Sequence, residues 1–270
     1  MRIVVSLSTI PSRVEKLNII VDNMLRQTLQ PDSIIINLPF HSIREKRPYP
    51  IFSSSCPLVK VNRCKDYGPL TKLYPTLQVE KDENTLIVTV DDDVNYPLDL
   101  LEQLYKAYKR NRECAIGASG YTVGKWWNLF GRVNKPLVDT KTSVIEGYSG
   151  CLYKRGFFKD DLLDYGDAPK TMFYHDDLWI SGYLAKRGIP RYVMTNSIEH
   201  SNNSNGSNGL SDNKLMFIFK MIPAFAYFNG VFPEEHIVPI QDTIGFWITL
   251  IIVLLILMMF AITIQYKTLR

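Results

Sequence analysis

Short apolar runs rich in β-branched residues alternate along the chain with segments whose apolar residues recur at helical spacing. The short runs predict buried strands, and the periodic segments predict amphipathic helices. Strands that alternate with helices build a mostly parallel sheet covered by helices, so the pattern predicts an α/β fold. The expected strands lie at 3–7, 33–38, 58–61, 85–90, 114–118, 143–153 and 191–195, and the expected helices at 13–28, 72–80, 98–110 and 176–186.

Two local features refine this picture. Ser12 stands before the first expected helix and Glu15 follows three residues later, which predicts a capping box. Residues 117–131 are rich in glycine and aromatic residues. Such a segment is typical of a binding loop or lid, and the alternative is a hydrophobic flap that only covers the sheet.

The C-terminal part of the chain has a different character. Residues 243–265 are almost wholly apolar and uncharged, which is enough to span the hydrocarbon core of a bilayer. The segment before it, 213–242, is expected to lie on the membrane surface or to pack back on the main domain. The predicted organisation is therefore a domain at 1–212, a juxtamembrane amphipathic segment, a single transmembrane helix and a short tail at 266–270.

The expected location is a membrane, with the main domain on the cytosolic side. The N-terminal apolar run is short and leads into polar residues, unlike a signal peptide, and the four scattered cysteines form no CxxC pair. Lys267 and Arg270 after the span point the other way under the positive-inside rule, which is weak for so short a tail.

Length and charge limit the function classes. A chain of 270 residues suggests about one domain with an appendage. Its net charge is +4, without a long basic run. Nucleic acid is therefore not expected as a partner.

The most informative chemistry is the triplet Asp91-Asp92-Asp93, directly after the apolar run at 86–90. A buried strand that ends in carboxylates delivers them to the carboxyl edge of a sheet, where open α/β sheets bind ligands. Adjacent carboxylates repel one another, and a divalent cation would offset that repulsion. The alternative is that these residues only cap the following helix, but three acids exceed what capping requires.

Four further segments carry groups suited to chemistry: 8–13 after the first strand, 66–73 with a turn and a lysine, 175–179 at a helix start, and 199–200. Each has an ordinary explanation when it is taken alone. Lys72 could be solvated, Asp176 or Asp177 could cap a helix, and His200 could be a surface histidine.

Taken in order, these segments resemble a GT-A-fold nucleotide-sugar glycosyltransferase of the DxD type, similar to some bacterial and viral members. Val90-Asp91-Asp92-Asp93 fits the DxD motif, and Tyr174-His175-Asp176-Asp177-Leu178-Trp179 fits the downstream acidic motif near the acceptor. Segments 8–13 and 66–73 look like donor-binding loops, and the resemblance covers about residues 1–205. It implies a Rossmann-like mixed sheet that is mostly parallel, and a hexosyltransferase-like enzyme.

The resemblance also implies a divalent metal, manganese or magnesium, that bridges the donor diphosphate. Asp93 is the first choice as its ligand, Asp91 would contact the ribose, a metal-bound water or the metal, and His200 would complete the metal shell. A cation of this kind neutralises the charge that develops on the leaving nucleoside diphosphate. The donor-binding residues implied are Ser8, Thr9, Arg13, Lys72, Asp91 and Asp92.

On the acceptor side, an inverting transfer needs a base, and Asp176 and Asp177 are the candidates, with Asp177 slightly favoured by the resemblance. The small-residue segment 147–150 resembles one that lines the acceptor side, although a tight bend explains it equally well. The acceptor could be a glycan, a lipid-linked molecule or a protein, and the stereochemistry stays open.

Two other classes compete with this interpretation. A phosphotransferase would place its DxD motif on the first strand, whereas this triplet follows a later strand. A non-catalytic, membrane-tethered protein of the same fold would bind a nucleotide-sugar without turnover, and the retained acids, Lys72 and His200 argue against it.

Overall fold

The computed structural model describes residues 1–122, 131–133, 136–195, 201–202, 224, 226–228 and 231–232. The chain divides into two units. Residues 1–121 and 132–233 form the first, which holds the sheet and helices described below. Residues 122–131 and 234–270 form the second, of which only Thr122 and Gly131 are among the described residues.

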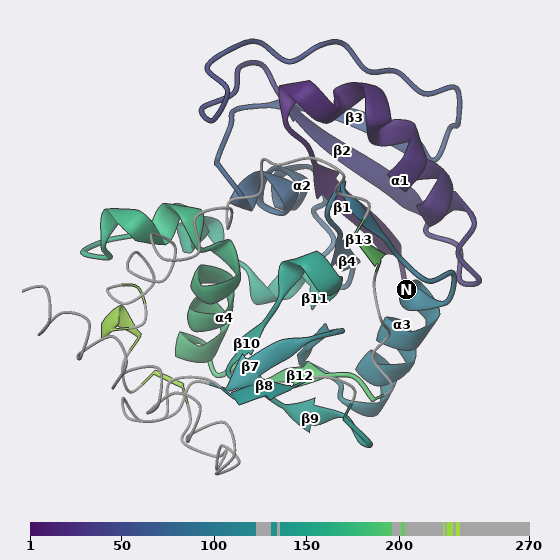
Figure 1. Cartoon of the computed structure of the whole chain (residues 1–270). Helices are drawn as coiled ribbons and strands as arrows, with labels where there is room; N and C mark the ends of the chain where they lie inside the picture. Colours follow the sequence, from purple (N-terminus) through teal and green to yellow (C-terminus); the bar gives the residue numbers. More distant parts are fainter. Residues whose placement is uncertain are drawn as a thin grey trace, which may run out of the picture. The chain divides into compact units, whose positions relative to one another are not determined.

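An eight-stranded sheet is the centre of the first unit (Figure 1). Its strands are β1 (Ile3–Ser8), β2 (Ser33–Pro39), β3 (Val59–Cys64), β4 (Leu86–Thr89), β6 (Ala115–Gly117), β9 (Thr140–Lys141), β11 (Cys151–Lys154) and β12 (Arg191–Val193). They lie in the order β3-β2-β1-β4-β11-β6-β12-β9. Only β11 and β9 pair antiparallel with their neighbours, so six strands run in one direction. The predicted mixed, mostly parallel sheet is confirmed.

Helices flank this sheet, as predicted. The α-helices are α1 (Leu17–Leu25), α2 (Tyr74–Val79), α3 (Leu100–Arg110) and α4 (Asp176–Lys186), and the 3-10 helices are η1 (Pro11–Lys16), η2 (Leu70–Lys72), η3 (Gly147–Ser149), η4 (Arg155–Phe157), η5 (Asp160–Leu163) and η6 (Lys170–Tyr174). Two small sheets complete the described elements, one of β7 (Gly120–Thr122), β8 (Gly131–Val133) and β10 (Val144–Ile145), the other of β5 (Val94–Asn95) and β13 (Ser201–Asn202).

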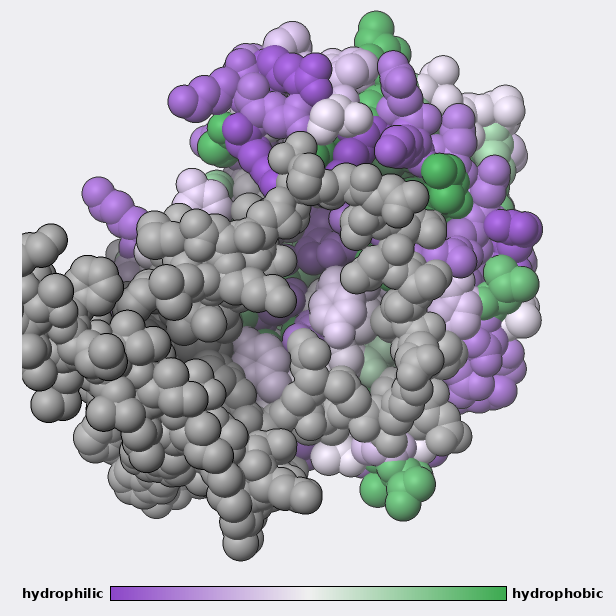
Figure 2. All heavy atoms as spheres, in the orientation of Figure 1, coloured by the Kyte–Doolittle hydropathy of each residue, from purple (hydrophilic) through white to green (hydrophobic). Residues whose placement is uncertain are grey.

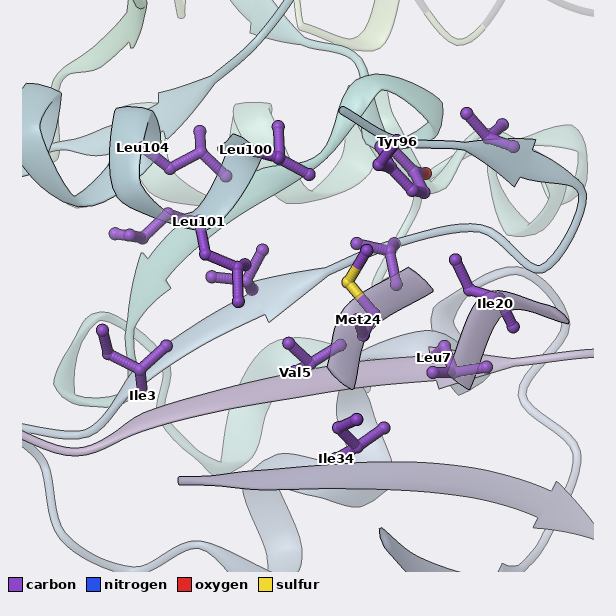
Figure 3. Packing of buried hydrophobic residues seen from close by; sticks show 14 of the residues in the cluster. Ile3, Val5, Leu7, Ile20, Met24, Ile34, Tyr96, Leu100, Leu101 and Leu104 are labelled. Atoms are coloured by element: carbon purple, nitrogen blue, oxygen red, sulfur yellow. The ribbon is translucent and has the colours of Figure 1, made fainter. Parts of the chain in front are cut away.

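The main apolar core lies between one face of the sheet and helices α1 and α3. Alternate residues of a strand point to opposite faces. In β1, Val5 and Leu7 therefore face this core, where they meet Ile20 and Met24 of α1 (Figure 3). Leu100, Leu101 and Leu104 of α3 belong to the same cluster. Both faces of the central strands are covered, which explains why their sequences read as continuous apolar runs.

A buried polar ladder crosses the opposite face of the sheet, next to α2. Ser6, which alternates with Val5 and Leu7, shares a hydrogen bond of 2.6 Å with Thr76 of α2. Asn37 Nδ2 on β2 donates to Thr76 Oγ1 at 2.8 Å, and Asn62 Nδ2 on β3 donates to Asn37 Oδ1 at 2.9 Å. These side chains satisfy one another where water is excluded, so α2 has one defined position over β1–β3.

The strand order makes a topological switch point between β1 and β4. From β1 the chain moves outward to β2 and β3, and then returns to the other side of β1 as β4. The loops that leave β1 and β4 therefore diverge at the carboxyl edge, and ligands of open α/β sheets bind at such a switch point.

Three expectations from the sequence need correction. The predicted capping box is wrong, because η1 starts after Ile10 without a side-chain cap and the Ser12 hydroxyl donates to Glu45 instead. The single strand expected at 143–153 is broken into β10, η3 and β11. The strand at 191–195 is followed by another, β13. The four cysteines are free thiols, and Cys114 and Cys151 are buried.

None of the helices in the described part of the chain is long and apolar enough to cross a membrane. The predicted span at 243–265 and the tail lie outside the described residues, as does most of the segment 213–242. These assignments stay predictions.

Two neighbouring isoleucines on α1 test the position of the core. Ile20 is 1% exposed against the sheet, whereas Ile19 is 56% exposed. We expect Ile20→Ala to lower the free energy of unfolding by about 2–5 kcal/mol, because it leaves a cavity. Ile19→Ala is the matched control and should change it by no more than about 0.5 kcal/mol. Denaturant unfolding of the two variants measures this, and equal losses would contradict the assigned core face.

Candidate active site

The loop after β1 is bonded to the acidic triplet after β4. Arg13 Nη1 lies 3.1 Å from Asp92 Oδ1 and 2.8 Å from Asp93 Oδ2. The Thr9 hydroxyl donates a hydrogen bond to Asp92 Oδ2. Arg13 can reach both acids because the chain enters η1 directly after the strand and brings its guanidinium back over the edge of the sheet. The two loops at the switch point are therefore joined by charge-assisted hydrogen bonds.

The three acids of the triplet differ in their surroundings. The Asp92 side chain is 10% exposed, against 28% for Asp91 and 32% for Asp93. Burial raises the pKa of Asp92, an effect that the Thr9 hydroxyl and the Arg13 guanidinium partly offset. Asp92 is therefore the buried acid that bonds to the loop after β1, while Asp91 and Asp93 are more exposed to solvent.

Lys72 links the triplet to the downstream acidic pair. It ends η2, and its Nζ lies 2.9 Å from Asp91 Oδ1 and 3.2 Å from Asp176 Oδ2. Burial lowers the pKa of Lys72, but Asp176, Asp91 and Asp177 more than compensate, so the pKa is raised and the ammonium stays charged. The backbone of Lys72 is fixed as well, because the Ser6 hydroxyl of the polar ladder donates to its carbonyl oxygen at 2.5 Å.

The turn before Lys72 is stabilised by Asp66. Its Oδ1 accepts hydrogen bonds from Gly68 N at 2.8 Å and from the Thr71 hydroxyl at 3.3 Å. Gly68 has φ +62°, and a Cβ at that position would lie 2.6 Å from the Phe173 ring. This turn therefore requires glycine, both for its backbone conformation and for the space beside η6.

Asp177 lies against the backbone of η3. Gly147 N–H donates to Asp177 Oδ1 at 2.9 Å. A Cβ on Gly147 would lie 2.6 Å from this oxygen and 2.7 Å from Lys72 Nζ, so only glycine allows so close an approach. Burial raises the pKa of Asp177 well above its usual value, and the Asp176 and Asp91 carboxylates raise it further against the opposing effect of Lys72.

Tyr96 holds the first acid of the triplet in place. Asp91 N–H donates to Tyr96 Oη at 2.9 Å, and this hydroxyl donates to the Tyr148 carbonyl oxygen at 2.7 Å. The tyrosine thus ties the end of β4 to η3, the helix that contacts Asp177. Sequence reasoning missed Tyr96 and Ser6, and it gave the 147–150 segment a bend as an equal alternative. A polar aromatic residue three positions after the acidic triplet was the only signal for Tyr96.

Most of the predicted site residues lie together at the carboxyl edge of the sheet. Ser8 ends β1 but makes no hydrogen bond with the acids in the described part of the chain. His200, the predicted third metal ligand, lies outside the described residues. The residues that the contacts connect are Thr9, Arg13, Lys72, Asp91, Asp92, Asp93, Asp176 and Asp177.

The carboxylate oxygens of the site suit a divalent cation in chemistry, but not fully in arrangement. Five carboxylates face only two cationic side chains, Arg13 and Lys72, in this cluster. Asp91 and Asp93 each use one oxygen in an ion pair, and their other carboxylate oxygens accept no hydrogen bond from a described residue. Carboxylate oxygens are the ligands that magnesium and manganese prefer. Within the described ranges, however, no group of three acidic, histidine or cysteine side chains is arranged to hold a metal ion.

Comparison with known proteins adds no family to this description. The sequence matches no family model, and no curated protein matches it.

The raised pKa of Asp177 predicts a pH-dependent stability. A carboxyl group whose folded-state pKa exceeds the unfolded value of 3.8 does not destabilise the folded protein below that value, because it is protonated in both states. As pH rises toward the folded-state pKa, the group increasingly lowers the free energy of unfolding. Asp177→Asn removes this effect and keeps an oxygen for Gly147 N–H. We therefore expect the variant to gain free energy of unfolding relative to the parent as pH rises from about 4 to about 8.

Urea unfolding across this pH range measures the difference. Asp160→Asn, at an exposed position, is the matched control and should follow the parent at every pH. A difference between Asp177→Asn and the parent that stays constant or shrinks with pH would contradict the burial of this carboxylate.

Proposed function

We propose that this chain is a glycosyltransferase that moves a sugar from a nucleoside-diphosphate donor to an acceptor hydroxyl. The observation that carries the proposal is the meeting of two acidic groups at the switch point of the sheet. Asp91–Asp93 and the pair Asp176 and Asp177 come from distant parts of the sequence, and Lys72 ion-pairs with both groups. One group suits the donor diphosphate and the other suits the acceptor.

On the donor side, Arg13 and Lys72 supply positive charge for the phosphates. Asp91 and Asp93 would hold manganese or magnesium, with His200 as the proposed third ligand. Such a metal would supply Lewis-acid neutralisation of negative charge on the diphosphate leaving group. Asp92 is hydrogen-bonded to Thr9 and Arg13 and fixes the loop that would receive the donor. Asp91 and Asp93, not Asp92, are therefore the proposed metal ligands.

On the acceptor side, Asp177 acts as the general base. Burial and the neighbouring Asp176 and Asp91 carboxylates raise its pKa, so its carboxylate is a stronger base than an ordinary one, which suits proton abstraction. The acceptor oxygen bonds to the anomeric carbon while its proton moves to Asp177. The bond from that carbon to the diphosphate oxygen breaks, and its electron pair leaves with the nucleoside diphosphate. Asp176 keeps Lys72 in place through their ion pair.

The proposed site is compatible with several classes of acceptor. Glycans, lipid-linked molecules and proteins all offer hydroxyl groups that Asp177 could deprotonate. The proposed location is a membrane, through the predicted span at 243–265, with the catalytic domain on the cytosolic side.

Two variants separate the donor and acceptor roles. With a panel of uridine, guanosine and thymidine diphosphate sugars and manganese, we expect wild-type protein to release nucleoside diphosphate. Asp93→Asn should abolish metal-dependent donor binding in calorimetry. Asp177→Asn should keep donor binding but lower turnover by about 10²–10⁴-fold, the usual contribution of a general base.

Asp167→Asn is the matched control, because Asp167 is an exposed acid away from these contacts. It should leave both donor binding and turnover unchanged. Donor binding without turnover in the wild type would favour the non-catalytic alternative. No metal-dependent donor binding in the wild type would contradict the proposal.

A further inference from the structure

The segment between β2 and β3, residues 40–58, borders the candidate site without contributing to its chemistry. It leaves the carboxyl end of β2, and in Figure 1 it forms a long loop beside the edge strand β3. Tyr49 Oη donates to the Thr9 carbonyl oxygen at 3.0 Å, and Ile43 N–H donates to Asp66 Oδ2 at 2.8 Å. These bonds hold the segment between the loops that follow β1 and β3. A long irregular connection in a compact domain is often a binding element.

Positive charge is concentrated on this loop and on the end of β3. Residues 40–58 and 63–66 together hold five cations against two acids, a surplus of three, while the whole chain has a net charge of +4. The acids are engaged internally, Glu45 with Ser12 and Arg47, and Asp66 with the turn before Lys72. The cations are all exposed: Arg44, Lys46, Arg47, Arg63 and Lys65.

Exposed apolar side chains occur in the same segment of the chain as these cations. Phe40 and Ile43 are exposed, and Ile51 is 92% exposed. The Arg63 guanidinium lies 5.0 Å from the centre of the Phe40 ring, so an apolar and a basic side chain lie together at this point. Figure 2 shows strongly hydrophilic residues with separate hydrophobic ones over this part of the molecule. We name Phe40, Ile43, Arg44, Lys46, Arg47, Ile51, Arg63 and Lys65 the basic rim.

We propose that the basic rim binds the surface of an anionic phospholipid bilayer. The cations pair with lipid phosphate and carboxylate groups, and Phe40, Ile43 and Ile51 enter the boundary between headgroups and acyl chains. An aliphatic side chain as exposed as Ile51 has a favourable environment there, whereas binding to a single-stranded nucleic acid depends on aromatic stacking and phosphate contacts. This membrane contact is separate from the predicted span and independent of the proposed catalytic activity.

Deuterium exchange of the full chain reconstituted in vesicles tests the proposal, because any membrane span then acts equally in all samples. We compare vesicles of phosphatidylcholine alone with vesicles that also contain phosphatidylserine. Peptides from 40–57 should exchange more slowly in the mixed vesicles, and added salt should reduce the difference by screening. Lys46→Glu and Lys65→Glu should each weaken the protection by at least about fivefold, the effect of one surface cation near such a membrane.

Matched variants keep the result interpretable. Lys81→Glu and Lys170→Glu reverse exposed lysines outside the rim and should leave the protection unchanged. Ile51→Asp should reduce it, whereas Leu137→Asp, at a residue 94% exposed, should not. Equal exchange in the two lipids overturns the proposal, and so does protection by added RNA or heparin without protection by phosphatidylserine. Loss of protection in the control variants as well as in the rim variants also overturns it.

Discussion

The ion pairs of Lys72 with Asp91 and Asp176 are the interaction on which the site depends. They join the end of the central strand β4 to the start of α4, across the carboxyl edge of the sheet. A lysine so deeply buried needs neighbouring carboxylates to stay charged, and removing one partner of a buried pair is costly. The hydrogen bond from Ser6 to its backbone carbonyl fixes Lys72 from the other side. The position of this ammonium therefore connects the polar ladder in the sheet to the acids at its edge.

The same cluster holds more negative than positive charge. Arg13 and Lys72 satisfy part of it, and the raised pKa of Asp177 shows that its surroundings disfavour another negative charge. A divalent cation at Asp91 and Asp93 would lower this repulsion, and a bound diphosphate would then meet a less negative site. Metal, phosphate and acceptor binding are expected to be coupled, because each changes the field at the others.

Much of the fold could be predicted from the sequence, because its signals are local. The apolar runs of β1, β2 and β4 and the periodicity of α3 and α4 depend on neighbouring residues. The capping box at Ser12 failed because the partner of that hydroxyl, Glu45, comes from a distant loop. A bend at 147–150 was one of two equal interpretations of the sequence, and the choice needed the fold, because Asp177 and Tyr96 contact this segment only in the folded chain.

The location of the site could be predicted from the sequence, but the role of each of its residues could not. Three consecutive acids look alike in a sequence, and only the fold makes Asp92 the buried one, bonded to Thr9 and Arg13. The polar ladder was equally hidden, because Ser6, Asn37 and Asn62 are single polar residues that strand pairing and the strand alternation bring together with Thr76.

The most direct test of the central claim is anomalous diffraction from crystals of this chain grown with manganese and a nucleoside diphosphate. We expect one strong manganese peak bound by carboxylate oxygens of Asp91 or Asp93, with the diphosphate between the metal and the loop that carries Arg13. Manganese bound elsewhere, or the diphosphate bound away from the switch point between β1 and β4, would contradict this expectation.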